Sequence, residues 1–174
     1  MNTKGLIGRL DRFGRAFAGI AGVVSDADAR WKPPSGAWSV LEIARHLGDE
    51  EVEDFRARLR MTLEDPSAPW PRNDPEAWAR ERGYNEADLG EAVRRFVHER
   101  AESVRWLESL RGADWSRAYV HPKAGPISAA DLLVSWSAHD ALHMRQVAKR
   151  MYELAAREGE GLKVGVKYAG EWGA

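Results

Sequence analysis

The chain of 174 residues has no cysteine, no excess of basic residues and no long apolar run. Without cysteine it has no disulfides, no thiolate metal ligands and no catalytic thiol of its own, which fits the reducing cytoplasm where we expect it. Its 26 Lys and Arg balance 27 Asp and Glu. No basic block alternates with aromatic residues, so we expect no nucleic-acid partner. No stretch reaches the ~18 apolar residues of a membrane span, so we expect no membrane partner either.

The N-terminal segment has two interpretations, a signal peptide and an amphipathic helix. Basic residues precede the apolar run AFAGIAGVV (16–24), and ADA at 27–29 resembles a cleavage site. The alternative depends on apolar residues that recur at intervals of four and three: Leu6, Leu10, Phe13, Phe17, Ile20 and Val24. This periodicity favours the helix, which we predict over about 3–25.

Apolar residues recur with the same helical period in three further segments, which we predict as helices at about 39–63, 86–110 and 128–157. The second and fourth helices begin with capping boxes, Ser39 with Glu42 and Ser128 with Asp131. No segment shows the alternating pattern of a strand. Four helices with one long connection predict an all-α fold, a four-helix bundle.

The connection between the second and third helices, about 64–85, is long and rich in proline. We predict one domain over 1–174, with a C-terminal tail at 158–174. Trp70 and Trp78 lie in the connection, and we expect them to pack back on the bundle. They are candidates for a wall of the functional site, and a loop anchored away from the site is the alternative.

Two of the five histidines, His139 and His143, stand four residues apart in SAHDALHMRQ (137–146). They interrupt an apolar stripe, and imidazoles at this spacing on a helix can converge on one cation. The alternative is two buried histidines that each find a hydrogen-bond partner. HDALH differs from the zinc-protease motif HExxH by the shorter Asp140, and no histidine follows His143, so we exclude a metalloprotease.

His46, in EIARHLGDEE (42–51), is the candidate third ligand. It shares a polar helix face with Glu42, Glu50 and Glu53, which favours a solvated side chain. If His46 binds a metal, the site must lie at an open edge or end of the bundle, as an enzyme would require.

The remaining two histidines are predicted to lie at the surface. His98 falls on the Arg-rich side of the third helix. His121 precedes Pro122 in a loop, where a surface role is expected and an approach to the site is the alternative.

Three segments resemble the DinB/YfiT-like family, which is unrelated to the DNA polymerase also called DinB. They are GAWSVLEIARHLGDEEVEDF (36–55), DPEAWA (74–79) and YVHPKAGPISAADLLVSWSAHDALHMRQV (119–147). The likeness extends from about Trp31 to Arg150.

This resemblance implies a four-helix bundle with one divalent metal, nickel or zinc, held by His46, His139 and His143. It also implies a frequent homodimer and S-transfer from a low-molecular-weight thiol, such as bacillithiol or mycothiol, to an electrophilic small molecule. A metal-dependent hydrolase and a non-catalytic metal-binding stress-response protein are the alternatives.

Three polar residues near the proposed ligands are predicted to support the site. Asp140 stands where the YfiT branch often has another histidine, and we predict that it orients a ligand. Glu50, one turn after His46, is the second candidate for that role. Gln146, one turn after His143, is predicted to hydrogen-bond substrate or a bound water.

Overall fold

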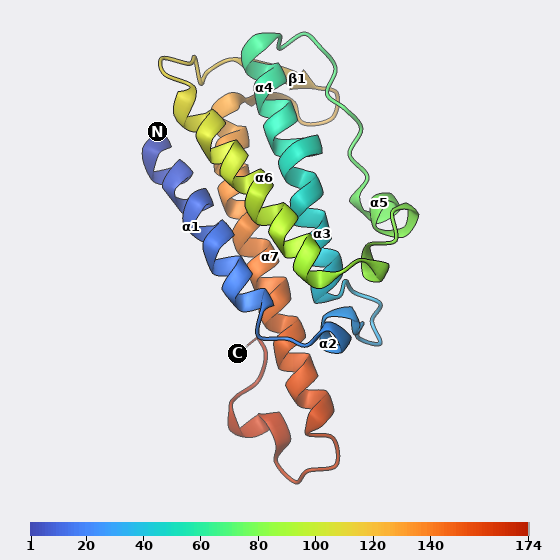
Figure 1. The fold of residues 1–174 in the computed structure, drawn as a ribbon. Coiled ribbons are helices and arrows are strands. Elements are labelled where there is room, and N and C mark those ends of the chain that lie inside the picture. The colour runs from blue at the N-terminus through green and yellow to red at the C-terminus, as the bar shows by residue number, and fades with distance from the viewer. Residues whose placement is uncertain (174) are drawn as a thin grey trace.

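Four long helical segments form the frame of the computed structural model, which describes residues 1–173 (Figure 1). Amphipathic periodicity accounts for each of them, since one apolar stripe must be buried against neighbouring helices. The segments are α1 (Thr3–Ala21), the continuous run α3 (Val40–Asp49), η1 (Glu50–Phe55) and α4 (Arg56–Glu64), then α6 (Leu89–Ser109) and α7 (Ala129–Glu158).

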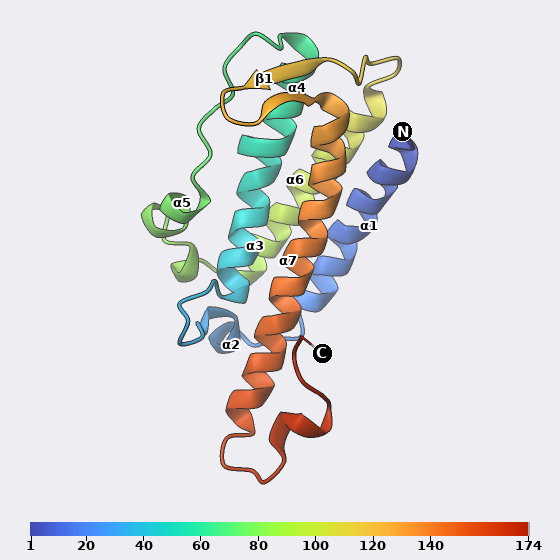
Figure 2. The same cartoon turned by 180° about the vertical axis from the view of Figure 1, so that it is seen from behind.

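The order of the helices around the bundle differs from their order along the chain. Both α1 and the α3–η1–α4 run pack against α6 and α7, so these two segments occupy opposite corners (Figures 1 and 2). In the view of Figure 1, α1 and α7 run downward, whereas α3–α4 and α6 run upward. The connection from α4 to α6 must therefore travel back along the whole bundle, which explains its length.

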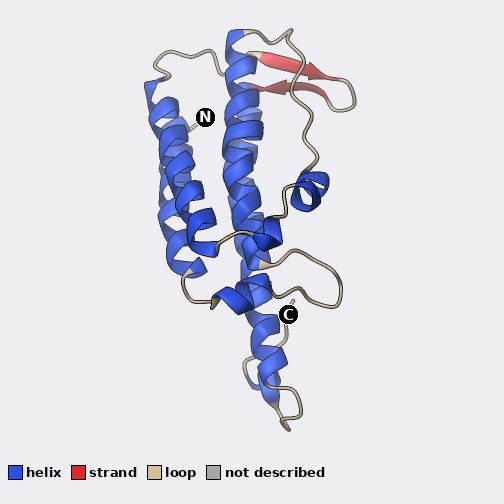
Figure 3. Cartoon of the chain, turned by 45° about the vertical axis from the view of Figure 1, so that its right-hand side comes forward, coloured by secondary structure: helices blue, strands red, loops and turns tan. Residues whose placement is uncertain are grey.

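Short elements fill the connections between the long helices (Figure 3). The connection from α4 to α6 contains two short helices, and a β-hairpin joins α6 to α7 at one end of the bundle. A further turn follows α7, where the chain folds back (Figure 1). These elements are α2 (Asp26–Arg30), α5 (Pro75–Glu81), η2 (Tyr84–Glu86), β1 (Ala118–His121), β2 (Gly125–Ser128) and η3 (Gly165–Tyr168).

The predicted bundle is confirmed, and the differences lie at element ends and in the hairpin. The first helix ends at Ala21, short of the expected residue 25, and the chain turns through Gly22 before α2 begins. The third helix begins at Leu89, with Asp88 as its cap. The hairpin was not predicted, because two strands of four residues are too short to display an alternating pattern.

The bundle core consists of two clusters of buried apolar side chains. In one, Phe17 and Phe96 meet edge to face, with ring centroids 5.2 Å apart. In the other, Phe55 stacks on Trp136 at 5.4 Å. No helix among residues 1–173 is long and apolar enough to cross a membrane.

A buried arginine links all four of the long segments. Arg100 on α6 is 2% exposed and donates to both carboxylate oxygens of Asp140 at 2.7 Å. It also donates to the carbonyl of Leu10 at 3.0 Å and lies 2.7 Å from Glu51 on η1. Trp136 donates to Glu51 as well, at 2.9 Å. The helices therefore meet around a hydrogen-bonded charge network as well as apolar side chains.

Candidate metal centre

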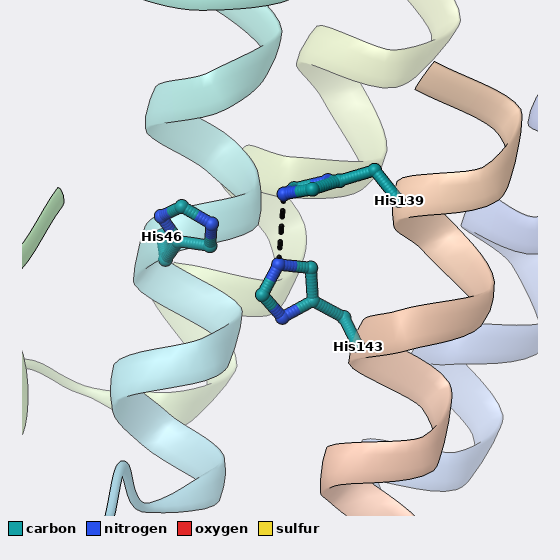
Figure 4. A group of neighbouring side chains, drawn as sticks. All are labelled: His46, His139 and His143. Carbon is teal, nitrogen blue, oxygen red and sulfur yellow. Dashed lines mark hydrogen bonds between the residues drawn. The ribbon is translucent and has the colours of Figure 1, made fainter. Parts of the chain in front are cut away.

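Three histidines from two helices converge inside the bundle. His46 lies near the end of α3, and His139 and His143 occupy successive turns of α7 (Figure 4). One ring nitrogen of each lies within 4.8 Å of the others. The Nε2 atoms of His139 and His143 are 3.0 Å apart. Two ligand nitrogens at the usual bond length of about 2.0–2.1 Å can share one ion at this separation.

His46 is buried, with 3% of its surface exposed, so the expectation of a solvated side chain is wrong. The polar face of α3 is covered by the segment before the helix and by the α4–α6 connection. Trp38 packs edge-on against the His46 ring at 4.8 Å, and Asn73 from the connection donates to Glu50 at 3.2 Å. A helix wheel cannot detect such a cover, because it comes from residues distant in sequence.

The histidines are held in the neutral form that binds metals. Burial lowers the pKa of His46 to about 2, of His139 to about 3 and of His143 to about 4, from the ordinary value near 6.5. In His46 and His139 the neighbouring imidazoles add to this effect. At neutral pH all three rings therefore offer a nitrogen lone pair.

Gln146, and not Asp140, is the polar neighbour that contacts a histidine. The Nδ1 atom of His143 lies 2.8 Å from Oε1 of Gln146. If Nδ1 carries the proton, it donates to this oxygen and leaves the Nε2 lone pair directed at His139. Asp140 instead pairs with Arg100 and makes no hydrogen bond to a histidine within the described chain. Burial raises its pKa to about 6, partly offset by the hydrogen bonds from Arg100.

The run from α3 to α4 passes through a π-helical segment that begins about one turn after His46. This segment, η1 (Glu50–Phe55), has a wider turn than an α-helix, and such segments are frequent at functional sites. Through it Glu50, Asp54 and Phe55 all reach the cavity beside the histidines. The prediction of one uniform helix over 39–63 missed this feature, because a single wider turn barely alters the apolar period.

A pair of carboxyl groups stands next to the histidines. Glu50 lies 3.7 Å from His46 Nδ1. Burial, followed by the charge of Asp54, raises the pKa of Glu50 to about 9, so it holds its proton at neutral pH. Asp54 pairs with Arg58 at 2.6 Å. Both carboxyl groups line the cavity beside the histidines, and the role of Glu50 in orienting His46 stays a prediction.

A cavity of about 530 Å³ opens onto the histidines. Trp38 and Phe55 provide its aromatic walls, and most of the other lining side chains are polar. Its residues come from the segment before α3, from α3 and η1, from the α4–α6 connection and from α7: Gly36, Ala37, Trp38, His46, Glu50, Asp54, Phe55, Asn73, Pro75, Glu76, His139, His143, Gln146 and Arg150. This volume is typical of small-molecule sites.

The aromatic residues predicted as site walls lie elsewhere. Trp70 stacks on Tyr119 of the hairpin at 4.4 Å and donates to Thr62 at 3.2 Å. Trp78 packs under Arg82 at 4.3 Å. His121 accepts hydrogen bonds within the turn of the hairpin. The long connection does wall the site, but through the residues around Asn73, so the anchored-loop alternative describes both tryptophans.

Several cavity residues were not singled out in the sequence. Trp38 is half-buried, and its indole donates to Glu76 at 3.3 Å. Asp54 stands four residues after Glu50, a spacing that places the two carboxyl groups on one helix face. Arg150 shares the helix face of the two histidines, seven residues after His143. Asn73, in an irregular loop, left no signal in the sequence.

The residues fit a divalent metal. The Nδ1 atom of His46 is buried and has no hydrogen-bond partner among residues 1–173. An unpartnered buried polar atom is unfavourable unless a ligand or an ion occupies the site. Three neutral imidazoles satisfy the preference of nickel and zinc for nitrogen.

Comparisons with known proteins agree with this arrangement. Residues 9–147 match the sequence pattern of the DinB superfamily. A "putative metal-dependent hydrolase" of Bacillus licheniformis is 31% identical over 130 residues, 67% of this chain and 68% of that protein. YfiT of Bacillus subtilis, which carries the same description, is 24% identical over 135 residues, 74% of each chain.

A solved structure shares the fold. YfiT from Bacillus subtilis, described as a probable metal-dependent hydrolase with an unusual four-helix bundle topology, matches with a TM-score of 0.71. The match covers 86% of this chain and 87% of that one, at 20% identity. The predicted family is thereby confirmed, and the chain belongs to the DinB superfamily.

Proposed function

We propose that the protein is a metal-dependent enzyme whose histidines His46, His139 and His143 hold one nickel or zinc ion. The convergence of three neutral imidazoles, two buried and one half-buried, on an accessible cavity supports this proposal. When bound, the ion supplies Lewis acidity toward a coordinated oxygen or sulfur atom. Three protein ligands leave coordination positions for substrate, as catalytic metal sites require.

Hydrolysis is the reaction that the geometry supports best. The observation that carries it is the carboxyl pair of Glu50 and Asp54, which lines the same cavity as the histidines. Asp54, held by Arg58, offers a carboxylate that can take a proton from an attacking water. Glu50, when it carries a proton, can donate it to a leaving group. The names of the relatives from the two Bacillus species point in the same direction.

S-transfer from a low-molecular-weight thiol is the second candidate. The chain has no cysteine, so a sulfur nucleophile must come from a small molecule. The cavity of about 530 Å³ has room for a thiol and an electrophile together. Trp38 and Phe55 give an apolar surface for the electrophile. The same carboxylate that takes a proton from water can take one from a thiol.

Metal analysis of the wild type and of His46→Ala, His139→Ala and His143→Ala tests the proposed site. We expect one equivalent of nickel or zinc in the wild type and a loss of affinity of at least about 100-fold in each variant, since each removes a ligand. His98→Ala is the matched control, because His98 is exposed and lies outside the cavity. Unchanged affinity in all three variants would refute the site.

A substrate panel then distinguishes the reactions. The metal-loaded protein is incubated with ester and amide substrates, and separately with thiols plus an electrophile. Product in the first panel supports the hydrolase, and thioether formation in the second supports the transferase. Inactivity in both, with metal bound, supports a non-catalytic metal-binding protein.

The homodimer expected from the family is part of this proposal and is tested by the mass of the protein in solution.

A further inference from the structure

Arg150 is a buried cation of the cavity to which no role has yet been assigned. It is 4% exposed, and among the cavity-lining residues that the structure describes it is the one with a permanent positive charge. Its Nη1 lies 2.8 Å from Glu153, but neither Nη1 nor Nε has a hydrogen-bond partner within residues 1–173. The ion pair with Glu153 leaves the Nε–H of this buried guanidinium without an acceptor in the described chain, which is unfavourable.

The proposed metal ligands separate Arg150 from the acidic end of the cavity. Helix α7 runs antiparallel to the α3–α4 run (Figure 2). Phe55, at the acidic end, contacts His139 with ring centroids 5.1 Å apart. Trp38, from the segment before α3, contacts His46 at 4.8 Å. Seven residues beyond His143, Arg150 therefore lies toward Trp38, on the side away from the carboxyl pair.

We propose that Arg150 binds the carboxylate of the small molecule that reacts at the three histidines. The guanidinium fork matches a carboxylate in shape and charge, and such a pair is strong when it is removed from water. A carboxylate-bearing substrate would thus lie with its anion at Arg150 and its reacting atom at the histidines. This proposal rests on the metal site proposed above, but it holds for hydrolysis and for thiol transfer alike.

The helix geometry sets the length of the ligand. Seven residues along α7 span about 10 Å, because each residue rises 1.5 Å. A helical side chain leans back toward the N-terminus, so the guanidinium lies closer to the histidines than its own Cα does. A carboxylate at Arg150 is thus roughly 5–10 Å from the histidine nitrogens, a distance of about three to seven bonds. The substrate is a short carboxylic acid with its reactive group at the opposite end.

A series of thiol probes of two chain lengths tests the role of Arg150. The thiolate anchors each probe at the metal whichever reaction the enzyme catalyses. Titration calorimetry on the zinc-loaded protein compares 3-mercaptopropionate and 6-mercaptohexanoate with 3-mercaptopropanol and 6-mercaptohexanol. We expect at least one acid to bind about tenfold more tightly than the alcohol of equal length, as a charged hydrogen-bonded pair provides.

Variants assign this preference to Arg150. R150Q should remove the difference between acid and alcohol while leaving the affinity for the alcohol unchanged. R150M fills a similar volume without a polar group and takes the place of R150Q if that variant does not fold. R145Q is the matched control, because Arg145 is an exposed arginine on the same helix outside the cavity, and it should keep the preference.

Failure of the metal site and failure of the role proposed for Arg150 give different results. If zinc does not bind, or if no thiol binds to the zinc-loaded protein, the metal site is wrong and the role of Arg150 falls with it. If acids and alcohols bind equally well to the wild type at every length, only the role of Arg150 is wrong. A preference that survives in R150Q or R150M also overturns it, because another group then binds the carboxylate.

Discussion

Among single residues, Gln146 is the side chain that orients a proposed ligand. Its Oε1 atom is the hydrogen-bond partner of His143 Nδ1 at 2.8 Å. Removing such a partner frees the ring and the choice of tautomer, which typically lowers metal affinity about 10–100-fold. We therefore expect Gln146→Ala to weaken zinc binding by this factor in a competition titration. Arg145→Ala, one residue away and exposed, should bind as the wild type does. Equal affinity of both variants would contradict the role.

Asp49 anchors the polar side of α3 through three partners. It is 1% exposed and accepts hydrogen bonds from Tyr84 and, at 2.7 Å, from Arg82, while Arg95 lies 2.5 Å away. Burial alone would raise the pKa of Asp49, but these partners more than offset it and hold the pKa below its ordinary value. The carboxylate consequently stabilises the fold above pH ~4, and this contribution disappears as the pH falls through the lowered folded-state pKa.

Asp49→Asn should therefore destabilise the protein at pH 7 by about 1–3 kcal/mol, because the substitution leaves the partly exposed guanidinium groups of Arg82 and Arg95 without this anion. The difference from the wild type should shrink below pH ~4, where Asp49 takes up a proton in the unfolded chain. Urea unfolding at pH 7 and pH 3 measures both. Asp26→Asn, at an exposed position in α2, is the control. A difference that does not change with pH would show that the carboxylate charge is unimportant.

Among the elements, α7 carries two of the three histidines and begins with a reciprocal cap. Ser128 accepts from the backbone of Asp131 at 3.1 Å, and Asp131 accepts from the backbone of Ser128 at 2.9 Å. Ser128→Ala should lower the free energy of unfolding by about 1 kcal/mol. Metal affinity should not change, since His139 lies three turns away. Ser135→Ala, at an exposed position within α7, should be neutral or slightly stabilising in the same denaturation experiment. Equal stabilities of the two variants would contradict the capping role.

The helical elements differ in how well the local sequence predicts them. Both capping boxes were predicted from three-residue spacings, and both are present. The π-helical segment at Glu50–Phe55 was not predicted, although it contributes residues of the α3–α4 run to the cavity lining. The segment contacts α6 and α7, and a single wider turn barely alters the local apolar period.

For the whole molecule, Arg100 is the residue that connects α1, η1, α6 and α7. Arg100→Met would leave Glu51 and Asp140 buried without their cation, and such a loss typically costs about 3–5 kcal/mol. We expect this destabilisation in guanidinium unfolding. Because burial already raises the pKa of Asp140 to about 6, the unpaired carboxyl groups should take up protons in the folded variant. That uptake makes the loss greater at pH 8 than at pH 5.

Two further variants check this interpretation. Arg94→Met removes an exposed arginine from the same helix and should be nearly neutral. Adding Glu51→Gln and Asp140→Asn to Arg100→Met should recover part of the stability, because the buried charges are then gone. If Arg100→Met is as stable as Arg94→Met, the network contributes little and apolar packing alone holds the helices together.

The sequence by itself determined the bundle, the family and the three histidines as candidate ligands. Helical periodicity and capping are local in the chain, so one sequence displays them, and His139 and His143 share a helix face for the same reason. The resemblance, and not the helix wheel, selected His46. The metal-binding role of all three stays a prediction.

Only the tertiary structure decided the surroundings of these histidines. The polar face of α3 is buried because a loop about 25 residues further along the chain crosses it, and Asn73 in that loop contacts Glu50. Asp140 pairs with Arg100, forty positions earlier in the chain. The hydrogen-bond partner of His143 is instead Gln146. Such contacts depend on which helices are neighbours. Here α1 and the α3–α4 run stand at opposite corners, an order that no local pattern encodes.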